Sequence, residues 1–226
     1  MAGSLPRSAD ARLTGDRSQR VFDALLRTLA EPGTIRSLPD ALPTSVPTVA
    51  WLPLALADVD VLVVITDGEG RADTAVATAV TRMVVEATRA TASTVPGAWL
   101  VAVLPDPAGR PAVLPTGIAT GTALAPEDGA RVALPVASLT PGPRPATPAD
   151  GPISTLTMAG PGVPTSRTVS VAGLDPTVAA ALGTATGAAP TGFDTWLFTP
   201  GGSVMALSRT TTITVGPDAP ERREEI

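Results

Sequence analysis

The sequence predicts an α/β fold, a mixed sheet with flanking helices. Residues 61–65 form an apolar, mostly β-branched run, which is typical of a strand buried on both faces. A helical pattern of apolar residues follows over 73–89, and residues 98–104 form a second apolar run. Strand, helix and strand in this order are typical of a crossover unit in an α/β sheet.

The first element expected is a helix over residues 18–30. Asp16 or Ser18 is placed to cap its first turn. A Glu-Pro-Gly sequence at 31–33 ends it, because proline disfavours the helical conformation of the residue before it. A short apolar element is expected over 51–57, after a stretch broken by prolines. One apolar stripe is expected on the helix, made of Val21, Phe22, Leu25, Leu26 and Leu29.

The strand at 61–65 is expected to turn over residues 67–70 and lead into a second helix. Asp73 is the expected cap of that helix, which continues to Arg89. Its spacing predicts one apolar face, made of Val76, Val80, Met83, Val84 and Ala87.

The second half of the chain carries more strand signals. Residues 131–138 alternate in apolar character, although Pro135 restricts this strand to a sheet edge or to a strand end. Residues 140–150 contain four prolines and predict an exposed loop. Short strands are expected over 153–158 and 168–171.

A third helix is expected to begin with Asp175 as its cap and Pro176 in its first position, and to end at Gly183. A Pro-Gly-Gly sequence at 200–202 then predicts a hairpin between two apolar strands. The last three strands are expected over 195–198, 204–207 and 211–215.

A chain of 226 residues makes one large domain or two small ones. Neither half has enough long elements to stand alone, so a single domain over 16–216 is expected. The Pro-rich loop 140–150 lies within it, and residues 1–15 and 217–226 are expected to be a flexible N-terminus and a flexible charged tail.

The composition excludes many mechanisms. The chain contains no His, Cys or Tyr, and all 16 basic residues are Arg, so there is no Lys. Without lysine no Schiff base to pyridoxal phosphate can form, and without histidine a Ser-His-Asp triad is impossible. The ordinary nitrogen and sulfur ligands of zinc are missing. No cofactor and no metal site are therefore expected.

Charge and hydropathy limit the partners. The net charge is −5 and the arginines are scattered, which argues against a nucleic-acid surface. The uncharged stretches are interrupted by proline or rich in glycine, so no membrane span is expected. No signal peptide is recognisable, and a cytoplasmic protein is expected.

The most notable polar cluster is Ser208-Arg209-Thr210-Thr211, which lies between two apolar strands. Arginine with hydroxyl groups is suited to gripping a phosphate or carboxylate, so Arg209, Thr210 and Asp194 are the candidate ligand-binding residues. The alternative, which is favoured, is a structural ion pair or an edge residue whose charged end reaches solvent. Asp194 is expected to be the structural partner of an arginine or to cap a turn. No catalytic residue is assigned.

Two other patterns are weaker. Gly68-Glu69-Gly70 follows a strand but lacks the third glycine of a dinucleotide-binding loop, so a simple turn is favoured. Ser166-Arg167-Thr168 repeats the tripeptide at 208–210, and chance accounts for the repetition in a chain so rich in threonine.

Read in order, these segments resemble the PhnH family, a subunit of the carbon–phosphorus lyase system for phosphonate use. The resemblance is collinear from about residue 18 to 215, and it is the ordered set of motifs that is specific. The motifs are Ser18-Gln19-Arg20-Val21-Phe22, Leu29-Ala30-Glu31-Pro32-Gly33-Thr34-Ile35, Leu54-Ala55-Leu56-Ala57-Asp58, Gly121-Thr122-Ala123-Leu124-Ala125-Pro126-Glu127-Asp128-Gly129-Ala130, Val136-Ala137-Ser138-Leu139, Gly160-Pro161-Gly162-Val163, Gly192-Phe193-Asp194 and Ser208-Arg209-Thr210-Thr211.

The resemblance implies a fold like that of pyridoxal-phosphate-dependent transferases, without the cofactor. It implies a homodimer that joins PhnG, PhnI and PhnJ homologues, with the ATP-binding PhnL as a further candidate partner. These subunits are linked to displacing adenine from ATP by a phosphonate, which gives ribose 1-phosphonate 5-triphosphate. Cleavage of the carbon–phosphorus bond belongs to PhnJ. The family offers no established catalytic residue to carry over.

The expected function is therefore an accessory subunit of the carbon–phosphorus lyase complex that acts through protein surfaces and is not catalytic alone. One alternative is a stand-alone enzyme that binds a phosphonate or nucleotide near Arg209. The other is a regulatory ligand-binding module without obligate partners.

Overall fold

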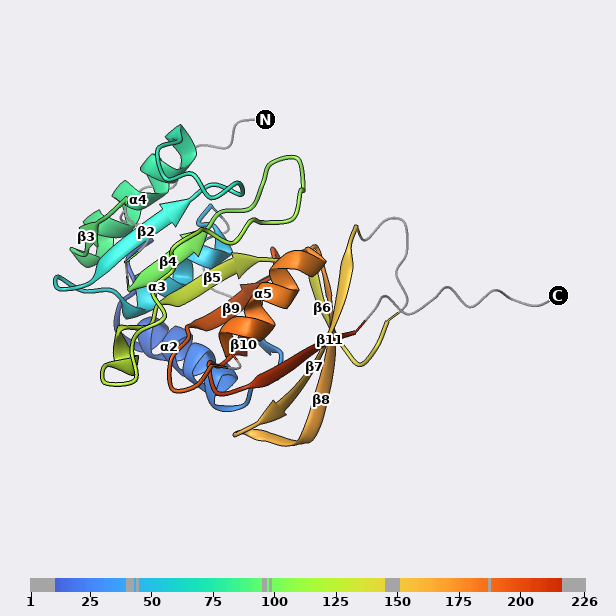
Figure 1. Cartoon of the computed structure of the whole chain (residues 1–226). Coiled ribbons are helices and arrows are strands. Elements are labelled where there is room, and N and C mark those ends of the chain that lie inside the picture. The colour runs from blue at the N-terminus through green and yellow to red at the C-terminus, as the bar shows by residue number, and fades with distance from the viewer. Residues whose placement is uncertain are drawn as a thin grey trace.

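The protein has an α/β architecture built on two sheets (Figure 1). The computed structural model describes residues 11–39, 43, 45–94, 97, 99–144, 151–186 and 188–216. A seven-stranded mixed sheet forms the centre, and a four-stranded antiparallel sheet lies to one side of it. The expected α/β class with a mixed sheet is confirmed.

The seven-stranded sheet has the order β1-β10-β9-β5-β4-β2-β3. Five neighbouring strands, β9, β5, β4, β2 and β3, run parallel, so their carboxyl ends share one edge. β10 and β1 continue the sheet in antiparallel pairing. The strands are β1 (Arg36–Ser37), β2 (Leu62–Thr66), β3 (Thr91–Ala92), β4 (Leu100–Val103), β5 (Arg131–Pro135), β9 (Asp194–Phe198) and β10 (Ser203–Leu207).

Alternate residues of these strands fill two separate apolar layers. Val63 and Ile65 of β2 pack into one layer, whereas Val64 packs into the other, as the two-residue period of a strand requires. Three helices cover the first layer, namely α2 (Gly15–Ala30), α3 (Trp51–Leu56) and α4 (Ala75–Thr88). A short 3₁₀ turn, η1 (Thr48–Ala50), precedes α3. The indole Nε1 of Trp196 in β9 donates a hydrogen bond to the carbonyl oxygen of Leu25 in α2 at 3.1 Å, and this bond fixes α2 against β9.

The four-stranded sheet and α5 (Pro176–Thr186) cover the second layer. Its order is β11-β7-β8-β6, and all its pairings are antiparallel. Three of these strands and α5 come from the chain between β5 and β9, and β11 comes from beyond β10. The strands are β6 (Ser138–Pro141), β7 (Ile153–Gly160), β8 (Val163–Ala172) and β11 (Thr212–Gly216).

Most expected elements are confirmed within a few residues. The strand, helix and strand of the expected crossover unit are β2, α4 and β4, and the Pro-Gly-Gly hairpin joins β9 to β10. Asp175 caps α5, because its Oδ1 accepts the backbone N–H of Thr177 at 2.7 Å. Residues 1–10, 145–150 and 217–226, which include most of the segments expected to be flexible and part of the expected loop, lie outside the described residues.

The caps of α2 and α4 were predicted wrongly. α2 begins at Gly15 after Thr14, so Asp16 lies inside the first turn, where its negative charge still faces the positive end of the helix. α4 begins at Ala75, and Thr74 caps it by accepting the N–H of Ala77 at 3.4 Å. Several polar residues lie near each start, and the local pattern does not distinguish among them.

The apolar faces were partly wrong as well. α2 buries Val21, Ala24, Leu25 and Thr28, a narrow arc that leaves Phe22 and Leu26 exposed. α4 buries Ala77, Val80, Met83 and Val84 and leaves Val76 exposed. Packing in the core therefore does not account for the apolar side chains of Phe22, Leu26 and Val76.

Pro135 is the last residue of β5, so the second of its two expected positions, a strand end, is confirmed. β5 itself is a central strand with Val132, Ala133 and Leu134 all buried. Two expectations about the second half are corrected. Gly183 lies inside α5 instead of ending it; a Cβ there would lie 3.3 Å from the carbonyl oxygen of Ile213, so the glycine permits close packing against β11. Thr140 and Pro141 belong to β6.

No helix in the described ranges is both long enough and apolar enough to cross a membrane. Both apolar layers pack against the seven-stranded sheet, one on each face. That residues 16–216 form a single domain stays a prediction.

Candidate functional site

Asp194 and Arg209 form a buried ion pair at the amino edge of the parallel strands. Asp194 is the first residue of β9, and Arg209 follows the end of β10. The Oδ2 of Asp194 accepts the Nε and Nη2 of Arg209 at 3.2 and 2.8 Å, and its Oδ1 accepts the backbone N–H of Arg209 at 2.9 Å. The two side chains are only 8% and 12% exposed.

The remaining donors of Arg209 reach a loop far away in the sequence. Its Nη1 donates to the carbonyl oxygen of Pro126, and its Nη2 lies 3.5 Å from the carbonyl oxygen of Gly129. Thr210 is exposed, and its hydroxyl group is paired with that of Ser208 at 3.0 Å. The structure thus brings two of the three candidate residues together and engages the guanidinium with protein acceptors.

Arg131 fixes the same loop from the neighbouring strand. It is the first residue of β5, and its guanidinium lies 3.8 Å above the ring of Trp99. Its Nη1 donates to the carbonyl oxygens of Glu127 and Gly129 at 3.3 and 3.1 Å. Burial lowers the pKa of Arg131, the charge of Arg209 lowers it further, and Asp194 opposes both effects.

The loop held in this way, residues 121–129, carries an unburied leucine. Leu124 is 97% exposed, the largest value among the exposed apolar side chains of the described residues. Glu127 and Asp128, which belong to the 3₁₀ turn η2 (Pro126–Asp128), are also exposed. The loop therefore presents an apolar side chain next to two carboxylates, on a base that two arginines hold rigid.

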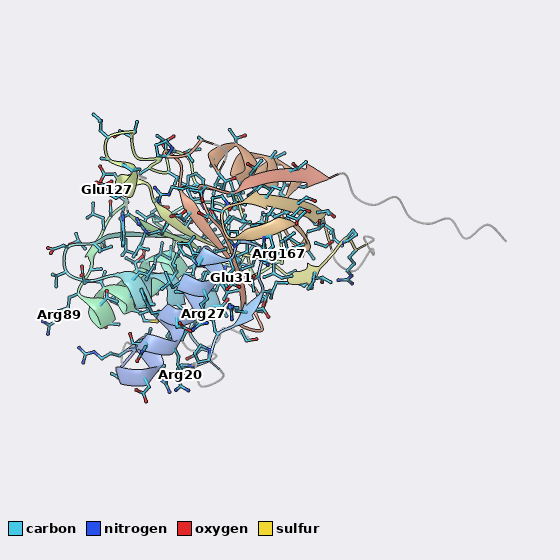
Figure 2. All side chains as sticks on the ribbon, turned by 90° about the horizontal axis from the view of Figure 1, so that it is seen from below. Arg20, Arg27, Glu31, Arg89, Glu127 and Arg167 are labelled. Carbon is cyan, nitrogen blue, oxygen red and sulfur yellow. The ribbon has the colours of Figure 1, made fainter. Side chains whose placement is uncertain are left out.

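The repeated Ser-Arg-Thr tripeptide has a structural counterpart. Arg167 of β8 donates from its Nη1 to the carbonyl oxygens of Glu31 and Pro32 at 3.2 and 2.7 Å, and to the hydroxyl group of Thr34 at 2.6 Å. Arg167 thus holds the loop after α2 as Arg209 holds the loop at 121–129. Figure 2 shows Arg167 near Glu31 at the end of the helix.

A second polar cluster, which was not among the candidates predicted from the sequence, lies at the opposite, carboxyl edge of the sheet. The pentapeptides Asp67-Gly68-Glu69-Gly70-Arg71 and Asp106-Pro107-Ala108-Gly109-Arg110 share the pattern Asp-x-x-Gly-Arg. One follows β2 and the other follows β4, which are adjacent parallel strands. The repeated pattern was the signal available in the sequence.

The two turns have the same hydrogen bonds. In each, the aspartate Oδ1 accepts the N–H of the second residue after it, at 2.9 Å for Glu69 and 2.7 Å for Ala108. In each, the aspartate Oδ2 accepts the arginine Nε four residues on, at 2.9 Å for Arg71 and 3.2 Å for Arg110. The glycines adopt positive φ values of 82° and 73°, which glycine adopts without strain.

The turns also contact each other. The Nη2 of Arg110 lies 2.6 Å from the Oε1 of Glu69 in the other turn. A Cβ on Gly68 would lie 2.9 Å from the Cβ of Asp106, so only glycine permits this approach. Five charged side chains, Asp67, Glu69, Arg71, Asp106 and Arg110, therefore form one network across the two strand ends.

The network shifts the pKa values of both aspartates downward. Burial alone would raise the pKa of Asp67, but hydrogen bonds from Arg71 and Glu69 and the charge of Arg71 outweigh it. The side chain of Arg110 lowers the pKa of Asp106, against a smaller opposing effect of burial. The pKa of Arg110 is raised by Asp106 first and by Glu69 second.

A cavity of about 370 Å³ opens beside this network. It lies at the carboxyl ends of β4, β5 and β9, the place where open α/β sheets bind ligands. Asp106 and Arg110 line one side, and the rest of the wall is mostly apolar.

A larger and more open hollow of about 670 Å³ lies between α2 and β1. Arg20, Arg27 and Arg36 line it together with Asp23. Figure 2 shows Arg20 and Arg27 in succession along α2, with Glu31 just after its end. The exposed Phe22 and Leu26 are on the same helix, so α2 carries apolar and basic side chains on its outer surface.

Among the described residues, no group of three or more acidic side chains is placed to hold a metal ion. Asp194 and Arg209 bond each other, and Asp67 and Asp106 each bond an arginine.

Comparison with protein families gives one match. A family model described as "Bacterial phosphonate metabolism protein (PhnH)" matches residues 12–214, which is most of the chain. No curated protein matches the sequence.

Proposed function

Because the chain belongs to the PhnH family of bacterial phosphonate metabolism proteins, a subunit of the carbon–phosphorus lyase system, we propose that it acts there as an accessory subunit. Its contribution is to the formation of ribose 1-phosphonate 5-triphosphate from ATP and a phosphonate, before the carbon–phosphorus bond is cleaved. It works as a homodimer bound to PhnG, PhnI and PhnJ homologues, with PhnL as a further partner.

The missing lysine supports a scaffold role. The proposed likeness to pyridoxal-phosphate-dependent transferases leaves only the framework of such an enzyme, because no Schiff base to that cofactor can form in this chain. With no His or Cys either, the described polar clusters consist of aspartate, glutamate, arginine and hydroxyl groups.

The exposed loop at 121–129 is the observation that carries the proposal. A leucine that is 97% exposed gains apolar burial only when another molecule covers it. The loop is held by Arg131 and by the buried Asp194–Arg209 pair, so it loses little conformational freedom on binding. Its neighbours Glu127 and Asp128 favour a partner subunit with an apolar pocket and a basic rim.

The surface of α2 supports a second contact of the opposite kind. Phe22 and Leu26 are exposed there, and three arginines against one aspartate line the adjacent hollow. This surface fits a partner segment that combines apolar side chains with carboxylates. Because the two surfaces differ in charge and Glu127 lies apart from α2 (Figure 2), each selects a different subunit.

The alternative of a stand-alone phosphonate- or nucleotide-binding protein using Arg209 has less support. The guanidinium donors of Arg209 already meet Asp194, Pro126 and Gly129, and the pair lies at the amino edge of the sheet. Ligand sites of open α/β sheets lie at the carboxyl edge.

Co-expression with tagged PhnG, PhnI and PhnJ homologues from the same genome tests the proposal. We expect this chain to co-purify in fixed stoichiometry and to be needed for formation of the triphosphate product. Absence of co-purification at physiological salt, with all the chains folded, would overturn the accessory role and favour an independent ligand-binding module.

A further inference from the structure

We propose that the cavity at the carboxyl edge of β4, β5 and β9 binds a small organic oxyanion with one compact apolar substituent, with its charge on the guanidinium of Arg110. This binding belongs to the isolated chain and does not depend on the proposed subunit role. Position, wall chemistry and the state of Arg110 each support it.

The position is the one at which α/β sheets hold ligands. The cavity is bounded by residues directly after three parallel strands: Pro105 after β4, Pro135 and Val136 at the end of β5, and Phe198 and Pro200 at the end of β9. Its volume of about 370 Å³ falls within the range of about 300–1,000 Å³ typical of small-molecule sites.

The wall is apolar except at one side. The apolar part contains Val46, Pro47, Pro105, Pro135, Val136, Ala137, Phe198 and Pro200. The polar side chains are those of Thr48, Asp106 and Arg110. An alkyl or aryl group of a ligand can therefore pack against the apolar wall, while the single anionic group of the ligand binds at Arg110.

Arg110 is preorganised to receive an anion. Its Nε and Nη2 both donate to the Oδ2 of Asp106, at 3.2 and 2.6 Å, which sets the direction of the guanidinium. Its Nη1 has no hydrogen-bond partner among the described residues, and the side chain is 61% exposed. An arginine held in this way can bind an oxyanion with its free donor at little cost in conformational entropy.

Asp106 is less suited to binding an organic cation than Arg110 is to binding an anion, because both carboxylate oxygens of Asp106 already accept hydrogen bonds. Its Oδ1 accepts the N–H of Ala108 at 2.7 Å, and its Oδ2 is bound to Arg110. Glu69, in contrast, places a carboxylate 2.6 Å from the Nη2 of Arg110. That side chain is 38% exposed, so an incoming oxyanion competes with a weak, solvent-exposed pair.

Calorimetric titration of the full chain tests the site with three probes: phenylphosphonate, benzoate and inorganic phosphate. We expect phenylphosphonate, benzoate or both to bind at least about tenfold more tightly than inorganic phosphate, because the apolar wall adds to the charge. The relative affinity of the first two distinguishes a phosphonate head from a carboxylate head.

Three variants locate the binding. Arg110→Gln removes the charge and should weaken binding at least about tenfold, whereas Glu69→Gln removes the competing carboxylate and should tighten it. Ala137→Phe fills the cavity from an exposed position and should block the substituted probes. Arg82→Gln, which removes the charge of an exposed arginine on α4 outside the cavity wall, is the control and should change nothing.

Equal binding of all three probes, or binding unaffected by both Arg110→Gln and Ala137→Phe in folded protein, would overturn the proposal. No binding of any probe by the wild-type chain and by Glu69→Gln would overturn it too. Either outcome leaves co-purification with the partner subunits unaffected, so failure of this site is distinguishable from failure of the subunit role.

Discussion

The carboxylate of Asp194 accepts hydrogen bonds from both the backbone N–H and the guanidinium of Arg209, and the same guanidinium contacts two carbonyl groups of a loop 80 and 83 residues away in sequence. One ion pair therefore connects the start of β9, the end of β10 and the loop at 121–129. Its members are buried, so neither can be removed without leaving the other charge unpaired.

Breaking this pair should destabilise the whole fold. We expect Arg209→Ala or Asp194→Ala to lower the free energy of unfolding by about 3–5 kcal/mol, because an uncompensated charge stays buried. Urea unfolding followed by circular dichroism measures the change. Arg27→Ala, which removes an ion pair whose side chains are 57% and 52% exposed, is the control and should cost less than about 1 kcal/mol. A similar small loss for Arg209→Ala would contradict the structural role of the pair.

Substitution of Leu124 should weaken partner binding without changing the stability of the fold. Leu124→Asp should leave the unfolding midpoint within experimental error, because the side chain makes little contact in the isolated chain. It should sharply reduce co-purification with the partner subunits, since a charge replaces the apolar contact. Val113→Asp, at an apolar residue that is 49% exposed, is the matched control. Undiminished assembly of Leu124→Asp would show that the loop is not an interface.

The two Asp-x-x-Gly-Arg turns predict sensitivity to acid. The pKa values of Asp67 and Asp106 are lowered in the folded protein, so their contribution to stability is complete above the unfolded-state pKa of about 3.9. That contribution disappears as the pH falls through the lower, folded-state values.

Urea midpoints measured between about pH 6 and pH 2 should therefore fall toward acid, and Asp67→Asn with Asp106→Asn should flatten the curve while lowering it at neutral pH. Asp58→Asn with Asp60→Asn, at two exposed positions, is the control. An acid dependence unchanged in the first double variant would refute this assignment.

Gly162 predicts a steric effect at the end of α2. Its φ is +78°, and a Cβ there would lie only 2.0 Å from the carbonyl oxygen of Ala30. Gly142 has a similar φ of +81° with no atom within 4 Å of its Cβ position. Both alanine variants lose stability because alanine disfavours a positive φ. The difference between their free energies of unfolding therefore measures the clash of the Cβ at residue 162 with the carbonyl oxygen of Ala30.

We expect Gly162→Ala to lower the free energy of unfolding by about 1–3 kcal/mol more than Gly142→Ala does, as overpacking usually does. Equal losses in denaturant unfolding would mean that α2 moves away from the β7–β8 turn without cost.

The buried strands and the helices were predictable because their signals are local. The apolar run at 61–65 and the Pro-Gly-Gly turn at 200–202 specify a buried strand and a hairpin wherever they occur. The position of β5 was not predictable, because Pro135 is compatible with an edge and with a strand end alike. The exposure of Phe22 was missed for a related reason, since helical spacing does not show how wide a face the sheet will cover.

The site was predictable only in part. A structural ion pair was one of several interpretations of the cluster at 208–211, and Asp194 was expected only to pair with some arginine or to cap a turn. The hydrogen bonds between Asp194 and Arg209 decide in favour of the ion pair. The Asp-x-x-Gly-Arg repetition is visible in the sequence, yet its meaning depends on β2 and β4 being neighbours. Topology, which no local pattern encodes, brings Glu69 to Arg110.

The place of β11 in the four-stranded sheet has a consequence for biosynthesis. β6, β7 and β8 leave the ribosome before β9 and β10, but β11 pairs with β7 and is made after all these strands. The outer edge of β7 thus stays open through translation of more than 50 residues and invites pairing with a neighbouring nascent chain until β11 emerges. Chaperone dependence of this chain should therefore be greatest between the emergence of β7 and that of β11.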